Sequence, residues 1–277
     1  MRRAKADLTI AAVRTALTIA GSDPTGGAGL QQDLQIFRSL GVHGAAVVTA
    51  LTVQDTAKVH RVLPAFPNVV LEQIRVLIRD VRIHAVKLGM LATDDVARMV
   101  ELGILELLHA RPEPPPLVID PVLAASDGTA LLERRAWPTL LRLFPEAALV
   151  TPNLPETELL TGRDVSGEAA VEAAARMLVE EFGARAALVK GGHRDGPPDD
   201  LLAERAEGGV SLAWLRGTRQ GGPPVHGTGC ALAAAIAAGL ASGRGLREAV
   251  EAARATLAVA YGHAFVAGAG ARILGLP

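Results

Sequence analysis

The sequence of 277 residues contains one cysteine, Cys230, so no disulfide can form within the chain and no cluster of thiolates can hold a metal. Net charge is nearly absent as well, because 28 Lys and Arg offset 29 Asp and Glu and leave a formal charge of −1. A nucleic acid or an anionic membrane would call for a surplus of basic residues, so neither is expected as a partner. These shortages favour a reducing cytoplasm and a small-molecule ligand.

Long apolar runs are also missing. Residues 231–241 form one of the longest, and it falls well short of the roughly 18 residues that a transmembrane helix needs. Near the start of the chain, Asp7 and Arg14 interrupt what would have to be the apolar core of a signal peptide, so no export is predicted. With 49% hydrophobic residues the chain can still fill a large core, which predicts a soluble, folded protein.

Short apolar runs rich in β-favouring residues recur along the chain and predict buried strands. They occupy residues 16–20, 45–51, 85–89, 117–120, 148–151 and 186–190. Between them the apolar spacing becomes helical, as in the stripe of Val96, Val100, Ile104 and Leu107. Strands that alternate with helices require a mainly parallel sheet covered by helices on both faces. We therefore expect a doubly wound α/β fold.

The segment 191–225 differs, because Gly and Pro clusters surround two short apolar runs and predict an antiparallel hairpin. Two helices are expected after it, at 227–241 and from Leu246 towards Ala264. No internal repeat and no long polar linker divides the chain. We therefore expect a single domain over residues 16–277, preceded by an N-terminal extension of residues 1–15.

The Gly-rich segment GSDPTGGAG, residues 21–29, separates the first predicted strand from the helix that follows it. In a parallel sheet this is the carboxyl end of a strand, where ligands bind, and its glycines allow a close approach of backbone to ligand. The segment matches neither a Walker loop nor the G-x-G-x-x-G fingerprint. A tight turn with Asp23-Pro24 as its punctuation is the alternative interpretation.

The pentapeptide HGTGC, residues 226–230, precedes and begins an Ala-rich predicted helix. Backbone N–H groups of Gly227, Thr228 and Gly229, together with the helix dipole, would form an anion hole for a transferred phosphoryl group. At this position the pKa of the Cys230 thiol should be lowered, which would make Cys230 a base or a nucleophile. The alternatives are an ordinary helix cap and a small buried thiol.

Polar residues follow three more predicted strands. Asp120 follows the fourth, and Asn153 and Glu156 follow the fifth, where carboxylates can hold a hydrated Mg²⁺ directly or through water. The alternatives are a turn former for Asp120 and a helix cap with a first-turn acid for the other two. Lys190 ends the sixth strand of a sequence with 24 Arg and four Lys, a hint of phosphate binding. The seven scattered histidines predict no zinc site.

Seven segments, taken together and in order, resemble the hydroxymethylpyrimidine and phosphomethylpyrimidine kinase (ThiD) branch of the ribokinase-like superfamily. They are ALTIAGSDPTGGAGLQQDLQ, VVTALTVQDT, VKLGML, IDPVL, TPNLPETELL, LVKGGH and HGTGC. The resemblance implies a ribokinase-like fold and a cytoplasmic kinase that uses ATP and Mg²⁺. Its substrates would be 4-amino-5-hydroxymethyl-2-methylpyrimidine (HMP) and HMP-phosphate in thiamine biosynthesis, and a homodimer is common in that family.

The resemblance also implies site residues. Those against the pyrimidine and its hydroxymethyl group would be Gly21, Asp33, Gln54, Met90 and Val122, with Asp33 on the hydroxymethyl. Those that catalyse transfer would be Gly227, Thr228, Gly229 and Cys230, with Cys230 accepting the proton. The metal residues would be Asp120, Asn153 and Glu156, and Lys190 would face the ATP phosphates. A Gln amide both donates and accepts, which suits the edge of an aminopyrimidine.

Three segments depart from the family pattern. Asp55 stands where Asn is usual, Ser126-Asp127-Gly128 stands where Lys-Ser-Gly is usual, and residues 219–225 are less polar than usual. A missing cation near the phosphates should weaken the second phosphorylation, because its substrate is more negatively charged.

Three other functions stay open at this point. The nearest is a pyridoxal or pyridoxine kinase on the same scaffold. A Cys-His hydrolase using His226 and Cys230 would leave TPNLPE and Lys190 without a role. A non-catalytic pyrimidine-binding protein is a further alternative, and the intact HGTGC argues against it.

Overall fold

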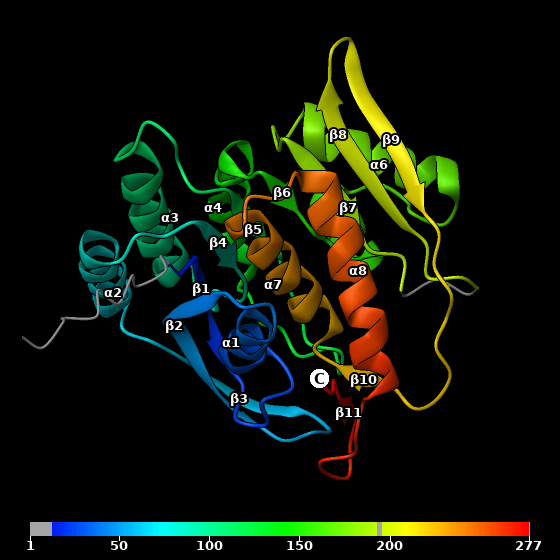
Figure 1. Ribbon diagram of the computed structural model, residues 1–277, viewed down its shortest axis with the longest axis horizontal. Coiled ribbons are helices and arrows are strands. Elements are labelled where there is room, and N and C mark those ends of the chain that lie inside the picture. Colours follow the sequence, from blue (N-terminus) through cyan, green and yellow to red (C-terminus); the bar gives the residue numbers. More distant parts are fainter. Residues whose placement is uncertain (1–12, 193–195, 277) are drawn as a thin grey trace, which may run out of the picture.

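The computed structural model describes residues 13–192 and 196–276. Its main strands are β1 (Thr15–Ser22), β2 (His43–Gln54), β3 (Val59–Pro64), β4 (Ala85–Leu88), β5 (Leu117–Ile119), β6 (Leu149–Val150), β7 (Ala186–Val189), β8 (Asp200–Ala206) and β9 (Gly209–Leu215). They form one sheet in the order β3-β2-β1-β4-β5-β6-β7-β8-β9 (Figure 1). The six central strands run parallel, and β3, β8 and β9 are antiparallel to their neighbours. The expected mainly parallel sheet and the expected hairpin are confirmed.

Helices cover both faces of the sheet, as the doubly wound fold requires. One face carries α1 (Gly29–Ser39), α7 (Thr228–Ala241) and α8 (Leu246–Gly262), and the other carries α2 (Pro67–Asp80), α3 (Asp94–His109), α4 (Trp137–Arg142), α5 (Leu154–Thr161) and α6 (Glu168–Glu180). Alternate strand residues divide between the two cores: Val86 and Leu88 of β4 belong to the core that includes α3, whereas Ala85 belongs to the core that includes α7. The sheet therefore separates two hydrophobic layers within one domain.

Helix α7 is almost wholly buried between the sheet, α1 and α8 (Figure 1). Its alanine side chains are small enough for close approach on every side. A Cβ on Gly239 would lie 3.0 Å from Cβ of Ala249 in α8, so these two helices nearly touch through their backbones. This tight packing fixes the start of α7, which carries Cys230, at the carboxyl ends of the central strands.

One detail differs from expectation. Strand β3 was not expected, because its sequence VHRVLP has one buried residue, Val59, and ends in a proline, as edge strands do. The first strand begins at Thr15, and residues 1–12 of the expected N-terminal extension lie outside the described part. A short parallel pair, β10 (Val225–His226) with β11 (Arg272–Ile273), stands apart from the main sheet. Among the described residues, no helix is long and apolar enough to span a membrane.

Candidate active site

The Gly-rich segment 21–29 and the HGTGC segment 226–230 lie against each other at the carboxyl edge of the sheet. His226 contacts Asp23, which lies 203 residues earlier in the sequence. A Cβ on Gly227 would collide with the carbonyl oxygen of Gly27, and Gly227 has a φ of 73° that side chains rarely tolerate. Glycine at 227 is therefore required by the contact itself. The contact places the start of α7 directly against the loop that leads into α1.

Three of the expected pyrimidine residues lie close together. A Cβ on Gly21 would come within 2.7 Å of the Met90 sulfur, so the backbone of Gly21 lies against that side chain. Met90 also belongs to a small apolar cluster with Ala50 and Ala92, against which Val122 packs. The structure thus brings Gly21, Met90 and Val122 together from three separate strand ends.

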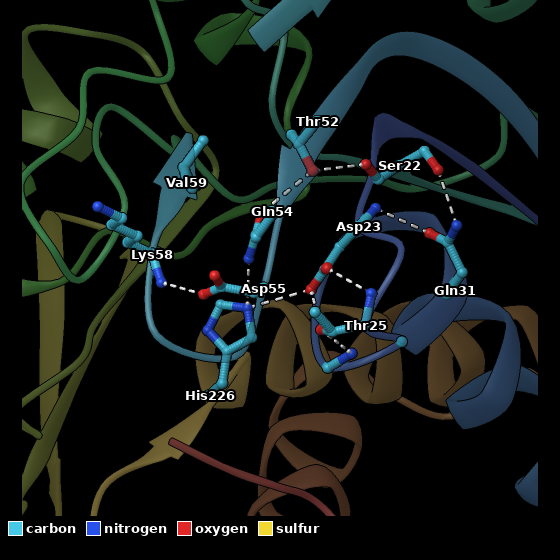
Figure 2. A network of polar contacts seen from close by, with 12 residues as sticks. Ser22, Asp23, Thr25, Gln31, Thr52, Gln54, Asp55, Lys58, Val59 and His226 are labelled. Carbon is cyan, nitrogen blue, oxygen red and sulfur yellow. Dashed lines mark hydrogen bonds and ion pairs between the residues drawn. The ribbon is translucent and has the colours of Figure 1, made fainter. Parts of the chain in front are cut away.

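Gln54, at the end of β2, takes part in a polar network beside the Gly-rich segment (Figure 2). Its amide lies 3.0 Å from Nε2 of His226 and 3.2 Å from Oγ1 of Thr52. The same His226 nitrogen lies 3.1 Å from a carboxylate oxygen of Asp23. His226 therefore connects the HGTGC segment to both the Gly-rich segment and β2, a role that the sequence analysis missed because its partners are so distant along the chain.

Asp33 is wholly buried in an ion pair that was also missed. Lys87 Nζ donates to its Oδ2 at 2.9 Å, and Thr18 donates to the same oxygen at 2.6 Å. Burial raises the pKa of Asp33, and the Lys87 ammonium opposes that rise. Oδ1 of Asp33 is buried and has no hydrogen-bond partner among the described residues.

Cys230 lies in the first turn of α7, and its sulfur accepts the backbone N–H of Gly29 at the start of α1. The sequence predicted a lowered thiol pKa at this position, and that prediction is wrong. Burial is the largest influence and raises the pKa of Cys230 to about 11, although the nearby Lys87 ammonium acts to lower it. Two helix N-termini favour a thiolate here, but the loss of solvation outweighs them.

Lys190 and Asp120 form a second ion pair beneath the HGTGC segment. Lys190 Nζ donates to Oδ1 of Asp120 at 2.7 Å, and Thr151 donates to the same oxygen at 3.0 Å. A Cβ on Gly229 would be 3.0 Å from Lys190 Nζ, so the ammonium lies directly against the backbone of the expected anion hole. Positive charge at this point suits an anionic ligand.

Asn153 and Glu156 form a capping box at the start of α5, as the alternative interpretation held. Glu156 N–H donates to Asn153 Oδ1, and Asn153 N–H donates to Glu156 Oε2, both at 2.8 Å. Burial raises the pKa of Glu156 to about 7, with the Asp120 charge adding to the rise and Lys190 opposing it. The described residues contain no group of three acidic, His or Cys ligands arranged for a metal. The carboxylate oxygens of Asp120 and Glu156 nevertheless suit a hydrated Mg²⁺, and a bound cation would reduce the repulsion between the two negative charges.

Comparison of the sequence with known proteins finds one family of kinases. A family model described as phosphomethylpyrimidine kinase matches residues 23–274. A relative from Rhizobium meliloti (strain 1021), named hydroxymethylpyrimidine/phosphomethylpyrimidine kinase, is 42% identical over 244 residues, which are 87% of this chain and 88% of the relative.

Two kinds of solved kinase structure are similar to the structure of this chain. The ADP complex of a pyridoxal kinase from Bacillus subtilis has a TM-score of 0.83 and 28% identity, covering 95% of this chain and 97% of that one. A phosphomethylpyrimidine kinase from Clostridium difficile 630 has a TM-score of 0.73 and 31% identity, covering 87% of this chain and 96% of that one. One similar structure is named a pyridoxal kinase and the other a phosphomethylpyrimidine kinase, so the fold by itself does not select between those substrates.

Proposed function

The chain belongs to the phosphomethylpyrimidine kinase family, and we propose on that premise that it transfers the γ-phosphate of ATP to the hydroxymethyl group of HMP, and then phosphorylates HMP-phosphate, in thiamine biosynthesis. The observation that carries this proposal is the close contact of Gly227 with Gly27. It joins the expected anion hole to the loop beside Met90, so that phosphate chemistry and pyrimidine recognition share one edge of the sheet.

Catalysis in this proposal is mostly positioning and charge stabilisation. The N–H groups of Gly227, Thr228 and Gly229 hold the γ-phosphate, and the free oxygen of Asp33 receives the hydroxymethyl group. The thiolate of Cys230 accepts the hydroxyl proton. A pKa of about 11 makes that thiolate scarce at neutral pH but strongly basic, and the Lys87 ammonium is the cation in place to stabilise it.

We assign the nucleotide side of the reaction to the second ion pair. Lys190 would face the ATP phosphates, while Asp120 and Glu156, with Asn153, would hold Mg²⁺ through its water shell. When bound, Mg²⁺ neutralises charge on the β- and γ-phosphates. The capping bonds of Asn153 and Glu156 favour contact through water, because their oxygens already accept backbone N–H groups.

A homodimer is part of the proposal, and one exposed apolar strip supports it. Leu51 and Leu63 are cross-strand partners in β2 and β3, and Val53 lies two residues further along the same face. These side chains are 54%, 41% and 43% exposed. A second copy of the chain would cover this strip. Light scattering compares the unmodified protein with the double variant Leu51→Glu/Leu63→Glu. A dimer that becomes a monomer in the double variant would support the proposal, and dimers of both proteins would contradict it.

The function itself is tested by incubating the protein with ATP, Mg²⁺ and either HMP or pyridoxal, and resolving the products over time. We expect HMP monophosphate and then diphosphate, at rates above those with pyridoxal. Pyridoxal is the competing substrate because the similar Bacillus subtilis structure is a pyridoxal kinase. Faster phosphorylation of pyridoxal than of HMP would favour the pyridoxal kinase alternative. Absence of product from both would overturn a kinase of either kind.

A further inference from the structure

The segment that follows α8 returns to the candidate active site and lies against the turn between β2 and β3 (Figure 1). Gly270 donates its N–H to Oγ1 of Thr56 at 3.0 Å, and Ala271 donates its N–H to the carbonyl oxygen of Thr56 at 2.8 Å. Gly270 and Thr56 are 214 positions apart in the sequence. One residue of the turn is therefore held both by its side chain and by its backbone.

The approach of the two segments is so close that it requires glycine on the C-terminal side. A Cβ on Gly270 would collide with the carbonyl oxygen of Thr56, and a Cβ on Gly268 would lie 2.5 Å from Oγ1 of the same threonine. Neither glycine has a positive φ, so the backbone conformation alone would accept a side chain at both positions. Any larger residue at 270 must push the segment away from the turn.

The same segment continues into two other parts of the candidate site. Strand β11 pairs with β10, and Arg272 donates its backbone N–H to the carbonyl oxygen of Pro224 at 3.0 Å, just before the HGTGC segment. A Cβ on Gly27, in the Gly-rich segment, would lie 3.2 Å from Cγ1 of Ile273. We call residues 268–273 the C-terminal clamp. It contacts the β2–β3 turn, the Gly-rich segment and the approach to HGTGC.

The turn that the clamp holds begins directly after Gln54, the last residue of β2, and Thr56 is two residues further on. Strand β3 is the edge of the main sheet, so the sheet supports this hairpin from one side only. At its other end the turn is held by Val59, whose N–H donates to Asp127 at 2.9 Å. Hairpins at a sheet edge open locally at low cost, so contacts at the turn govern where the turn lies.

We propose that the C-terminal clamp is a positioning element that holds the β2–β3 turn, and with it Gln54, in the conformation that binds the pyrimidine substrate. Thr56 and Gly270 are its positioning residues. The proposal rests on the proposed function, in which Gln54 meets the pyrimidine. When only clamped molecules bind the substrate, the apparent Kd for the substrate rises as the clamped fraction falls. Substrate affinity therefore depends on residues that need not touch the substrate.

The nucleotide side should be independent of the clamp. Lys190, which would face the ATP phosphates, directly follows β7, and four strands separate β7 from β2 in the sheet. Opening of the β2–β3 turn moves no strand between them. A weakened clamp should therefore raise KM for HMP and leave KM for ATP unchanged, whereas a general loss of structure would change both.

The test measures KM for HMP, KM for ATP and kcat in the unmodified enzyme and in four variants. Gly270→Ala places a Cβ against Thr56. Gly262→Ala is the matched control, because a Cβ on Gly262 would meet no neighbouring segment within 4 Å among the described residues. Thr56→Val keeps the shape of the side chain but removes the oxygen that accepts the N–H of Gly270, and Thr56→Ser restores that oxygen.

We expect Gly270→Ala to raise KM for HMP by about tenfold or more, with kcat and KM for ATP changed by less than about twofold. Thr56→Val should raise KM for HMP by about three- to tenfold, the usual effect of one lost hydrogen bond. Thr56→Ser and Gly262→Ala should change it by less than about twofold. The same KM for HMP in Gly270→Ala and Gly262→Ala would overturn the proposal, as would an equal rise of both KM values in Gly270→Ala.

A second measurement uses the unmodified protein and remains decisive if Gly270→Ala does not fold. Amide hydrogen exchange, resolved by residue, follows the N–H groups of Gly270 and Ala271, which bond to Thr56. HMP at about ten times its Kd should slow their exchange by roughly tenfold, because HMP binds only clamped molecules, and ATP alone should change it by less than twofold. Unchanged exchange with HMP bound would overturn the proposal. Absence of HMP binding in calorimetry would instead overturn the proposed function, so the two failures are distinct.

Discussion

Two Lys–Asp pairs lie near Cys230, and they differ in their access to water. Lys87 and Asp33 have side chains that are 0% exposed, whereas Lys190 and Asp120 are 13% and 3% exposed and lie against the backbone of Gly229. The first pair joins β4 to α1 inside the fold, and the second joins two strand ends at the surface of the site. We call them the sealed pair and the open pair.

The difference in exposure shows how the same kind of ion pair can serve either stability or ligand binding. A sealed pair has paid the cost of desolvation during folding, so removing one partner leaves a charge that nothing can solvate. An open pair can exchange its partner for a ligand, because water and anions reach its ammonium. We therefore expect the sealed pair to govern stability, the properties of Cys230 and, through the unpaired Oδ1 of Asp33, the proposed contact with the hydroxymethyl group. We expect the open pair to govern nucleotide binding.

The largest effect should come from Cys230, whose thiol feels both pairs. We expect Cys230→Ala to lower kcat by about 10²–10⁴-fold, because the hydroxyl proton loses its acceptor, and to leave the Kd for ATP nearly unchanged. Steady-state kinetics and calorimetry with ATP measure the two quantities. Cys230→Ser is the control for side-chain volume. Unmodified turnover in Cys230→Ala would remove the thiol from the chemistry.

The two pairs can be separated by the same substitution at each lysine. Lys87→Met should lower the free energy of unfolding by about 3–5 kcal/mol, because it leaves Asp33 buried with an uncompensated charge. Lys190→Met should cost less stability, since the Lys190 side chain is 13% exposed and water can reach the space it leaves, and should weaken ATP binding instead. Denaturant unfolding and ATP titration measure both variants. Equal losses of stability would show that the distinction between sealed and open pairs is mistaken.

Glu156, which neighbours only the open pair, should give stability a dependence on pH. Its pKa is raised from 4.5 to about 7 on folding, so between these values the folded state binds a proton that the unfolded state has lost. Stability should therefore fall as pH rises through this window, by at most about 1.4 kcal/mol per pH unit, and level off above it. Glu156→Gln should flatten the slope. An unfolding free energy in the unmodified protein that rises across the window would contradict the raised pKa.

The smallest effect should come from the loop that lacks the family's usual lysine. Asp127 accepts N–H groups from Val59 and Thr129, both at 2.9 Å, and these bonds hold its pKa below the usual range, so it stays ionised. A second phosphate entering near this carboxylate is disfavoured, so HMP-phosphate should react more slowly than HMP. Ser126→Lys should narrow that gap by a few-fold, and Ser126→Met, of similar length but uncharged, should not. Equal rates for both substrates, unmoved by Ser126→Lys, would assign the compensating cation elsewhere.

The sheet could be predicted because its central strands are buried on both faces and therefore appear as continuous apolar runs. Strand β3 was not predicted, because an edge strand needs no continuous apolar run and can end in a proline, which has no backbone N–H to donate. The capping box at Asn153 was anticipated as an alternative because it depends on residues three apart. Local patterns were thus sufficient wherever the structure is local.

The site could be predicted only in part, and for the opposite reason. Lys87 was within reach: a lysine inside a predicted buried strand must find an acid, and Asp33 is the acid on the adjoining helix. The partners of His226 were not within reach, because they lie 203 and 172 residues away. The thiol pKa was missed because a helix N-terminus is visible in sequence and the degree of desolvation is not.

The contact between Gly27 and Gly227 joins two segments that are 200 residues apart, so it can form only late in the synthesis of the chain. Every strand of the main sheet has been translated once the ribosome passes Leu215, yet α7 begins only at Thr228. At that stage α7 and α8, which cover much of one face of the sheet, have not yet been synthesised, and neither has His226, the partner of Asp23. The two helices that complete this face, and the start of α7 that completes the candidate site, are therefore encoded by the last fifth of the chain.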